Sequence, residues 1–330
     1  MARVSKNGNK QKEGQSKRTA ILYEVANEWL AFKSLSVKAS TYARYKAALD
    51  IHVLPFLGDC ETKEITSTHI STFANEKLEN GRLDKTGGLA ASTVCGLLTI
   101  IKSILDFALK TGKIKSPIRI PYPKHRCRKV RVLSKEEQIQ LESCWTKGAN
   151  IHKLGMLLCL YTGIRIGELC ALHWQDISIE QGMITICRTL QRVKDFSGSK
   201  NKTMIKVGTP KSQSSIRNIP IPKFLLSIIQ EHSTDKHGYF LASKKHGYTE
   251  PRTMQNYFAR ITKQLNISEA NFHALRHTFA TRCIEAGVDI KSLSEMLGHS
   301  CVNITLNRYV HSSFEQKRVG IDKLEKFVRA

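Results

Sequence analysis

The stretch Asn271-Phe272-His273-Ala274-Leu275-Arg276-His277-Thr278-Phe279-Ala280 combines apolar residues at helical spacing with two histidines and an arginine. On a helix, His273 and Arg276 leave the same face about one turn apart. Leu275, Phe279 and Ala280 fall on another face, which we expect to be buried. The stretch therefore predicts a helix that packs into a core and presents a histidine and an arginine together.

Two short motifs follow this stretch, Met296-Leu297-Gly298-His299 and Asn307-Arg308-Tyr309-Val310. Gly298 is typical of a helix end and would leave His299 at the tip of the helix. Tyr309 comes ten residues after His299. Two histidines, an arginine and a tyrosine can supply an acid, a base, an anion clamp and a nucleophile. The combination favours chemistry at a phosphate group.

A third motif, Tyr161-Thr162-Gly163-Ile164-Arg165-Ile166-Gly167-Glu168, places an arginine just after a helix-ending glycine. Arg165 can direct its fixed guanidinium fork at a phosphate from there, which a lysine cannot do. Glu168 follows one turn later and can hold either that fork or a catalytic histidine. Taken alone, the two residues fit an ordinary ion pair on a helix surface better.

Composition and charge bound the class of protein. The length of 330 residues predicts two domains. The formal net charge of +24, from 52 Lys and Arg against 28 Asp and Glu, indicates a polyanionic partner, and it favours nucleic acid over a membrane. A protein that is simply basic is the alternative. The nine cysteines form no C-x-x-C pair and are typical of buried thiols in a reducing cytosol. The N-terminus carries no apolar signal region, so we expect a soluble, intracellular protein.

Changes of composition along the chain predict four segments. Residues 1–18 are predicted to be a disordered basic tail. Residues 19–112 are predicted to form a helical domain, with helices near 19–32, 40–53, 66–78 and 90–110 and with Pro55 stopping the second. Residues 113–132 form a basic, proline-containing linker, which either crosses a DNA backbone or is only a solvated charge run. Residues 133–330 form the second domain.

The second domain mixes helices with a small antiparallel sheet. Strands are expected at 183–186 and 215–219, with a long polar loop at 194–203 between them. Helices are expected after Leu133-Ser134 and at 151–162, 166–172, 223–232, 252–265, 274–286 and 290–297. The final segment, 319–330, carries an apolar stripe that must dock either on its own domain or on a neighbouring protomer. The predicted fold class is therefore two-domain, mainly α, with a small antiparallel sheet.

The segments T-G-I-R-I-G-E-L-C-A-L, H-A-L-R-H-T-F-A-T, L-G-H and N-R-Y-V-H closely resemble the tyrosine recombinase (phage integrase) family in order, spacing and flanking apolar residues. The resemblance covers about 19–330 and includes S-T-Y-A-R-Y and L-P-F-L-G in the first domain. It implies that 19–112 is a helical core-binding (SAM-like) domain that binds DNA. It also implies that 133–330 is the mixed α/β catalytic domain, with a C-terminal oligomerisation tail.

The resemblance implies a set of catalytic residues. They are Arg165, Lys211, His273, Arg276, His299 and the nucleophile Tyr309, with Glu168 in support. Lys211 matches the family's lysine less closely, because Lys202 and Lys206 are nearby rivals. His277 and His311 are expected to be structural or to support the catalytic groups.

These residues make a coherent mechanism. A phenol with a pKa of about 10 is only about 0.1% ionised at neutral pH, so Tyr309 needs a base, for which His273 is the candidate. The two arginines would neutralise the non-bridging oxygens of a phosphorane, His299 would add a hydrogen bond, and Lys211 would protonate the departing 5′-oxygen. No metal, ATP or other cofactor is required. A zinc site at His273 and His277 is disfavoured, because H-x-x-x-H lacks the glutamate of H-E-x-x-H.

The resemblance implies site-specific strand exchange through a 3′-phosphotyrosyl link and a Holliday junction, serving integration or excision of a mobile element such as a phage or a transposon. The partners would be double-stranded DNA at specific sites, a homo-tetramer on that DNA and DNA-bending accessory proteins, with no membrane partner, in the bacterial cytosol or nucleoid. One alternative is a topoisomerase-type enzyme that nicks and closes DNA without needing a specific sequence. Another is a non-catalytic DNA-binding regulator on the same fold, against which the complete polar set argues.

Overall fold

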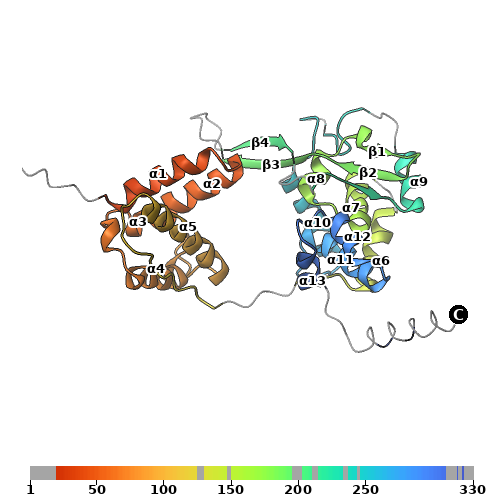
Figure 1. Ribbon diagram of the computed structural model, residues 1–330. Coiled ribbons are helices and arrows are strands. Elements are labelled where there is room, and N and C mark those ends of the chain that lie inside the picture. Colours follow the sequence, from red (N-terminus) through yellow and green to blue (C-terminus); the bar gives the residue numbers. More distant parts are fainter. Residues whose placement is uncertain are drawn as a thin grey trace, which may run out of the picture. The chain divides into compact units, whose positions relative to one another are not determined.

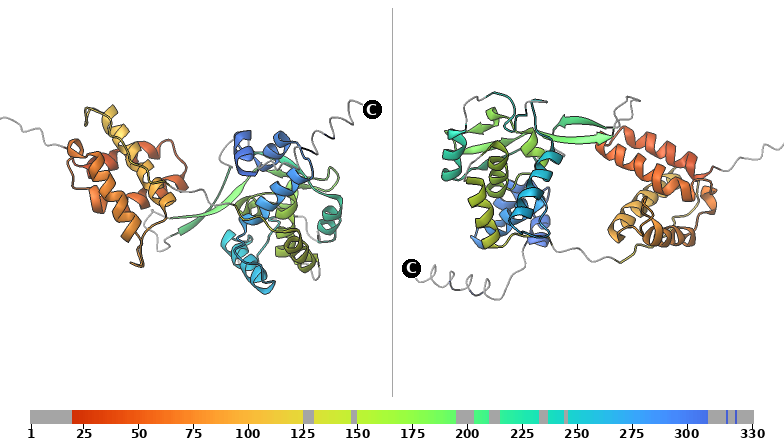
Figure 2. Two further views of the ribbon diagram at one scale, coloured as in Figure 1. Left: turned by 90° about the horizontal axis from the view of Figure 1, so that it is seen from below. Right: turned by 180° about the vertical axis from the view of Figure 1, so that it is seen from behind.

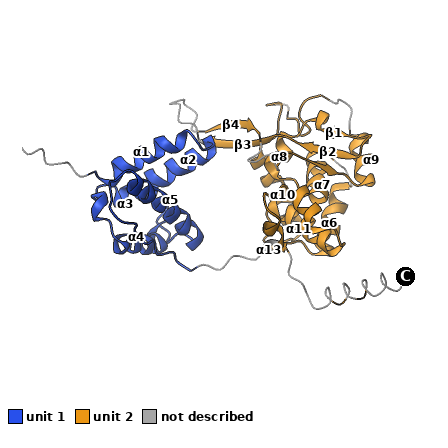
Figure 3. Ribbon diagram, in the orientation of Figure 1, with its two compact units in different colours: residues 1–127 blue, residues 128–330 orange. Residues whose placement is uncertain are grey.

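The computed structural model describes residues 20–124, 130–146, 150–194, 203–209, 215–232, 237–243 and 246–309, together with Arg318 and Asp322. The chain divides into two compact units, Met1–Cys127 and Arg128–Ala330 (Figure 3). The predicted basic tail 1–18 and the apolar stripe of the final segment lie outside the described residues. The limits of the four predicted segments, and the docking of the last one, therefore stay predictions.

Unit 1 is a bundle of helices around one apolar core (Figure 1). They are α1 (Leu22–Ser34), α2 (Ala39–Ala48), the π-helical η1 (Leu49–Val53), α3 (Leu54–Leu57), η2 (Thr62–Glu64), α4 (Ser67–Asn80) and α5 (Ala91–Lys110). Thr66 caps α4, because its side chain accepts a hydrogen bond from the backbone N–H of His69. By length and composition α5 could cross a membrane, but eight of its residues are buried in the core of unit 1. The four predicted helices of this region are confirmed.

The second helix of unit 1 does not stop at Pro55, and this prediction was wrong. α2 passes into the π-helical turn η1 and continues as α3 to Leu57, with Pro55 in the first turn of α3. Proline is tolerated in the first turn of a helix, where its missing N–H would have no partner within the helix. The change of hydrogen-bond pattern at η1 creates such a first turn inside a continuous helical segment.

Unit 2 combines helices with two antiparallel sheets (Figure 2). The helices are α6 (Lys135–Thr146), α7 (Ile151–Thr162), α8 (Ile166–Ala171), η3 (Trp174–Asp176), α9 (Lys223–Glu231), α10 (Pro251–Gln264), α11 (His273–Glu285), α12 (Ile290–Leu297) and α13 (Val302–Tyr309). The strands are β1 (Ile177–Ser178), β2 (Met183–Ile186) and β5 (Arg217–Pro220), in the order β1-β2-β5, and the hairpin of β3 (Thr189–Lys194) with β4 (Thr203–Gly208). Ile184 lies opposite Ile219 in the three-stranded sheet, and both are fully buried. The mainly α, two-domain fold class is confirmed.

The β3–β4 hairpin was not predicted. Strand pairing runs from Thr189 opposite Gly208 to Lys194 opposite Thr203, so the predicted polar loop over 194–203 keeps only its two end residues in the described part of the chain, and residues 195–202 lie outside it. The hairpin projects from the rest of unit 2 (Figures 1 and 2). Leu190 and Val193 on β3 are buried, and none of the β4 side chains is. An exposed hairpin with so little apolar alternation gives a weak strand signal in sequence.

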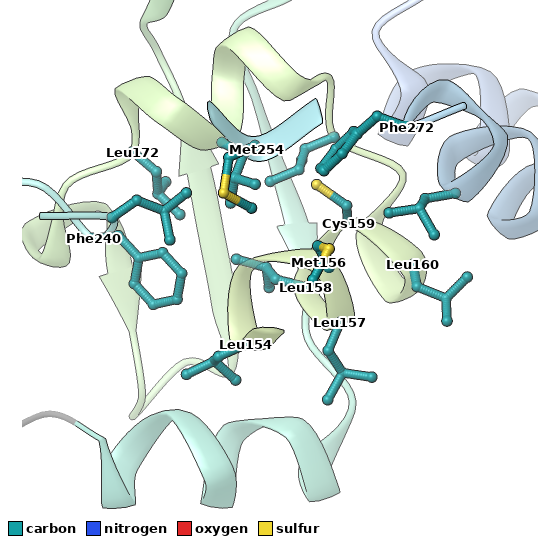
Figure 4. Close-up of a cluster of buried hydrophobic side chains, with 14 of the residues drawn as sticks. Leu154, Met156, Leu157, Leu158, Cys159, Leu160, Leu172, Phe240, Met254 and Phe272 are labelled. Atoms are coloured by element: carbon teal, nitrogen blue, oxygen red, sulfur yellow. The ribbon is translucent and has the colours of Figure 1, made fainter. Parts of the chain in front are cut away.

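Helix α7 lies in the centre of unit 2 and fixes the position of the site. Asn150 caps its start by accepting a hydrogen bond from the backbone N–H of Lys153. Its buried residues, Leu154 to Leu160 and Thr162, meet apolar side chains that include Leu172, Phe240, Met254 and Phe272 (Figure 4). A helix that is apolar on all sides belongs in a core. α11 packs against α7, so the end of one helix and the start of the other are held together.

Candidate active site

Two helix ends of unit 2 converge on one arginine. α7 ends at Gly163 with φ 64° and α12 ends at Gly298 with φ 62°, both left-handed, and the sequence predicted both helix ends. Arg276 on α11 donates from Nη1 to the carbonyl oxygen of Gly163 at 2.7 Å and from Nη2 to that of Leu297 at 2.7 Å. The C-terminal end of a helix carries partial negative charge. The buried guanidinium of Arg276 is therefore held by two helix ends.

The apolar face of α11 packs into the core and so positions Arg276. Leu275, Phe279 and Ala280 are buried, as predicted. A Cβ on Gly163 would lie 2.4 Å from the ring carbon Cδ1 of Phe279, so no side chain fits there. The close approach brings the Gly163 carbonyl within reach of Arg276. His273 and Arg276 both lie at the start of α11, but His273 is exposed, whereas Arg276 is buried.

Arg165 lies beside Arg276 but stays accessible. It occupies the N-cap position of α8, where Nη1 donates to Oε1 of Glu168 at 2.8 Å and Nη2 donates to the carbonyl oxygen of Gly298 at 3.2 Å. Its side chain is 37% exposed, against 3% for the side chain of Glu168. The Glu168 carboxylate therefore holds the fork of Arg165, which was one of the two roles considered for it, and leaves part of the guanidinium open to a ligand.

His299 completes the cluster. Its Nε2 lies 3.0 Å from Nη2 of Arg276, and its Nδ1 lies 2.8 Å from Oγ1 of Thr305. A guanidinium can only donate, so Nε2 accepts, and Nδ1 carries the ring proton toward Thr305. The structure thus gathers Arg165, Arg276 and His299, from three separate sequence motifs, at the end of α12, where Arg276 contacts His299 and the two arginines bind the neighbouring carbonyls of Leu297 and Gly298.

Tyr309 lies at the end of α13 in a buried position. Its hydroxyl is 2.7 Å from Nδ1 of His277, and the two residues are 8% and 7% exposed. The Tyr309 ring joins an apolar cluster with Phe279, Ala280, Leu293 and Leu297. The sequence had assigned His277 a structural or supporting role, and the structure makes it the direct hydrogen-bond partner of the tyrosine.

The remaining predicted catalytic residues are His273 and Lys211. His273 meets His277 edge-on, with ring centroids 4.6 Å apart. Lys211 lies outside the described residues, as do Lys202 and His311. The rival Lys206 lies on β4, exposed and opposite Gln191.

A third arginine belongs to this cluster and was missed in the sequence. Arg217 on β5 donates to both carboxylate oxygens of Glu168, at 3.2 and 2.9 Å. The available signal was the alternation of Ile216-Arg217-Asn218-Ile219, which puts Arg217 on the same face of the strand as the buried Ile219. An arginine on the apolar face of a strand needs a buried acidic partner.

The electrostatics of the cluster favour an anion. Burial would raise the pKa of Glu168, but hydrogen bonding and charge from Arg217, and then the charge of Arg165, outweigh it and lower that pKa below its usual value. Burial, followed by repulsion from Arg165, lowers the pKa of Arg276 to about 9, which leaves its guanidinium charged at neutral pH. Three guanidinium groups and one carboxylate leave two surplus positive charges. Within the described ranges, no group of three or more His, Cys, Asp or Glu side chains is placed to hold a metal ion.

Comparison with known families covers most of the chain. The phage integrase family matches residues 131–316, and the phage integrase N-terminal SAM-like domain matches residues 21–78. The chain is 27% identical to a "Tyrosine recombinase XerC-like" protein of Caldanaerobacter subterraneus subsp. tengcongensis, over 92% of this chain and 82% of that protein. It is 23% identical to the ICEBs1 integrase of Bacillus subtilis, over 90% of this chain and 80% of that protein.

Solved structures share the fold. The Tn1549 transposon integrase in complex with a circular intermediate DNA superposes with a TM-score of 0.75 at 20% identity, covering 92% of this chain and all (100%) of that one. A lambda integrase tetramer bound to a Holliday junction superposes with a TM-score of 0.65 at 19% identity, covering 90% of this chain and 80% of that one. At this level of identity the likeness establishes the two-domain arrangement of elements and leaves the chemistry to the residues.

Proposed function

The chain belongs to the phage integrase family, and from this premise we propose that it is a site-specific tyrosine recombinase, which cuts and rejoins duplex DNA to integrate or excise a mobile element. The observation that carries the proposal is the gathering of Arg165, Arg276 and His299 at the end of α12, beside the helix that bears Tyr309. Relatives named as integrases and as the transposase of Tn554 support a mobile element as the substrate.

The arginine cluster would receive the scissile phosphate. A phosphorane formed by attack on a phosphodiester carries two negative charges, which match the two surplus positive charges of the cluster. Arg165, whose guanidinium is accessible, contacts the non-bridging oxygens. Arg276 supplies positive charge from its buried position and orients His299. Groups already aimed at the developing charge need no reorganisation during the reaction. The chain therefore needs no metal ion for charge neutralisation.

Tyr309 is the proposed nucleophile, and its proton must move before or during attack. In the buried position its hydroxyl is bound to His277, so it must leave His277 to reach a phosphorus atom on DNA. His273, exposed at the start of α11, is the proposed base in the attacking state. The phenolate oxygen forms the bond to phosphorus, the bond to the 5′-oxygen breaks, and Lys211 gives that oxygen a proton. The 3′-phosphotyrosyl link conserves the energy of the broken bond, so rejoining requires no ATP.

The two units would share the work on DNA. We assign residues 19–112 to core-site DNA binding, 113–132 to a basic linker and 133–330 to catalysis and assembly. Exchange between two duplexes requires four active sites, so we propose a homo-tetramer that passes through a Holliday junction. We also propose that DNA-bending accessory proteins bind the same DNA and that the chain acts in the bacterial cytosol or nucleoid.

The decisive experiment is capture of the covalent intermediate. The protein is incubated with DNA of its own element that carries a nick near the scissile position, so that the short product diffuses away and rejoining fails. Denaturant-resistant adducts with one defined end, identified by sequencing, are expected, and EDTA should not reduce them. Adducts at random sequences together with relaxation of any supercoiled plasmid would indicate the topoisomerase alternative. Specific binding without adducts would indicate the regulator.

A further inference from the structure

Arg217 is enclosed in unit 2 by bonds from each nitrogen of its guanidinium. Nε donates to the carbonyl oxygen of Met296 at 2.6 Å, and Nη1 donates to that of Ser215 at 2.9 Å. Nη1 and Nη2 also donate to the two oxygens of Glu168, at 3.2 and 2.9 Å. The side chain is 6% exposed. Arg217 is therefore not placed to bind phosphate itself.

Glu168 is shared between Arg217 and Arg165. Its Oε1 accepts from Nη1 of each arginine, and its Oε2 accepts from Nη2 of Arg217 and from the backbone N–H of Arg165 at 2.9 Å. A carboxylate with one arginine partner tends to form a fork-to-fork pair that occupies both Nη groups. Here the fork-to-fork pair is made with Arg217, and Arg165 contributes one Nη to the carboxylate.

The backbone contact of Arg217 reaches a second part of the site. Met296 lies in the last turn of α12, directly before Leu297 and Gly298, whose carbonyls bind Arg276 and Arg165. A Cβ on Gly298 would lie 3.0 Å from Nη1 of Arg217, so this helix end lies against the arginine. One side chain thus touches both supports of the cluster.

We propose that Arg217 is a positioning residue for the arginine cluster that would bind the phosphate. By pairing with Glu168, Arg217 lets that carboxylate orient Arg165 without neutralising its charge. By binding the carbonyl of Met296, it also holds the end of α12 next to Gly298 and His299 in place. The proposal rests on the proposed function. Without Arg217, Glu168 would take the whole fork of Arg165 and cancel its charge. The surplus charge of the cluster would fall from two to one, and the phosphate would compete with a buried carboxylate for Arg165.

A purely structural brace makes different predictions, and the charge of the substrate distinguishes the two. Single-turnover cleavage is measured on the nicked substrate with a normal scissile phosphate and with a methylphosphonate, which lacks the negative charge that Arg165 neutralises. The variants are Arg217→Met, Arg217→Lys, Arg217→Met with Glu168→Gln, and Arg165→Ala as the positive control. Arg192→Met is the matched control, because Arg192 on the hairpin strand β3 makes a similar bidentate pair with Glu250, the N-cap residue of α10, at 3.0 and 2.6 Å.

Arg217→Met should slow cleavage of the phosphate by about 10²-fold, the size of effect seen when one donor to a developing oxyanion is lost. Most of this deficit should disappear on the methylphosphonate, as for Arg165→Ala. The added Glu168→Gln change should restore part of the rate, because the freed carboxylate is gone. Arg217→Lys should be intermediate, since lysine keeps the charge and loses the fork. Arg192→Met should match wild type.

An equal deficit on both substrates, or a double variant slower than Arg217→Met, would overturn the inference and leave Arg217 as a brace. The melting temperature and the DNA affinity of each variant are measured together with its cleavage rate. If Arg217→Met does not fold, the same comparison of the two substrates is made with Arg217→Lys and distinguishes the positioning role from the brace. Absence of adducts with the wild-type protein would instead contradict the proposed function. Failure of the inference and failure of the function are therefore separate outcomes.

Discussion

The two halves of the candidate active site are held in different ways. On the anion side, Arg276, Arg165 and Arg217 each make several hydrogen bonds to backbone carbonyls or to the buried Glu168, and these partners come from α7, α8 and α12. On the side of Tyr309, the proposed nucleophile, the described contacts of the eight-residue α13 include those of Tyr309 with His277 and of Thr305 with His299, and a small apolar cluster.

This difference suits the role that we propose for each half. Groups that stabilise charge work best when they are already in place, because moving them during the reaction would cost free energy. Tyr309, the proposed nucleophile, is 8% exposed, so we expect α13 to move before Tyr309 can reach DNA. The arginine side, which is built into the core of unit 2, is the half that we predict to be rigid, and α13 with Tyr309 is the half that we predict to be movable.

We expect the greatest loss from removing the hydroxyl of Tyr309, the proposed nucleophile. Tyr309→Phe should abolish the denaturant-resistant adduct completely, because no hydroxyl remains to attack. The rigid half should stay intact, with DNA affinity near wild type and a loss of about 1 kcal/mol in the free energy of unfolding from the broken bond to His277. Adducts are measured on denaturing gels and stability by urea unfolding. An adduct formed by Tyr309→Phe would assign the nucleophile elsewhere.

Within the rigid half, the two arginines should separate catalysis from stability. Arg165→Ala and Arg276→Ala should each slow cleavage by about 10²–10³-fold, the loss expected for one oxyanion donor. Arg276→Ala should also lower the free energy of unfolding by about 3 kcal/mol, because the carbonyls of Gly163 and Leu297 lose a buried donor. Arg165 is more exposed, so Arg165→Ala should unfold nearly as wild type does. Cleavage within a few-fold of wild type would make either arginine structural.

The two histidines of α11 test which side chain receives the proton of Tyr309. If His273 is the base, His273→Ala should slow cleavage by about 10²-fold and remove the histidine inflection from the pH–rate profile. His277→Ala should have a smaller effect, because His277 holds Tyr309 only in the buried position. The matched measurement is single-turnover cleavage from pH 5 to 9 for both variants, a range that brackets the ordinary pKa of histidine of about 6.5. A larger loss and a changed profile in His277→Ala would make His277 the acceptor.

The smallest expected effect is the acid dependence of the rigid half. The pKa of Glu168 is lowered in the folded chain from its usual 4.5. The stability that Glu168 contributes is thus fully present above pH 4.5 and is lost as pH falls through the lower folded value. Glu168→Gln should be less stable than wild type at neutral pH, and the difference should narrow in acid. Parallel unfolding curves for the two proteins from pH 7 down to about 3 would show that Glu168 is not ionised in the fold.

Much of the fold was readable from local patterns. The helical spacing around Leu275, Phe279 and Ala280 correctly predicted the buried face of α11, and Gly163 and Gly298 correctly predicted two helix ends. Pro55 misled, because a proline stops a helix only where it would break an existing hydrogen-bond pattern. The β3–β4 hairpin escaped notice, because its strands bury few side chains. The roles of the catalytic residues were suggested by resemblance and stay predictions.

Most of the helices, the basic charge and the polar residues available for phosphate chemistry could be read from the sequence alone, because periodicity, capping and left-handed glycines act between near neighbours in the chain. The contacts between those residues depend on the tertiary structure. Arg217 and Glu168 are 49 residues apart, Arg276 and Gly163 are 113 apart, and Arg165 and Gly298 are 133 apart. Which histidine holds Tyr309 depends likewise on how α13 packs against α11. A buried charge is stabilised only by the partner that packing brings to it, and no local pattern specifies that partner.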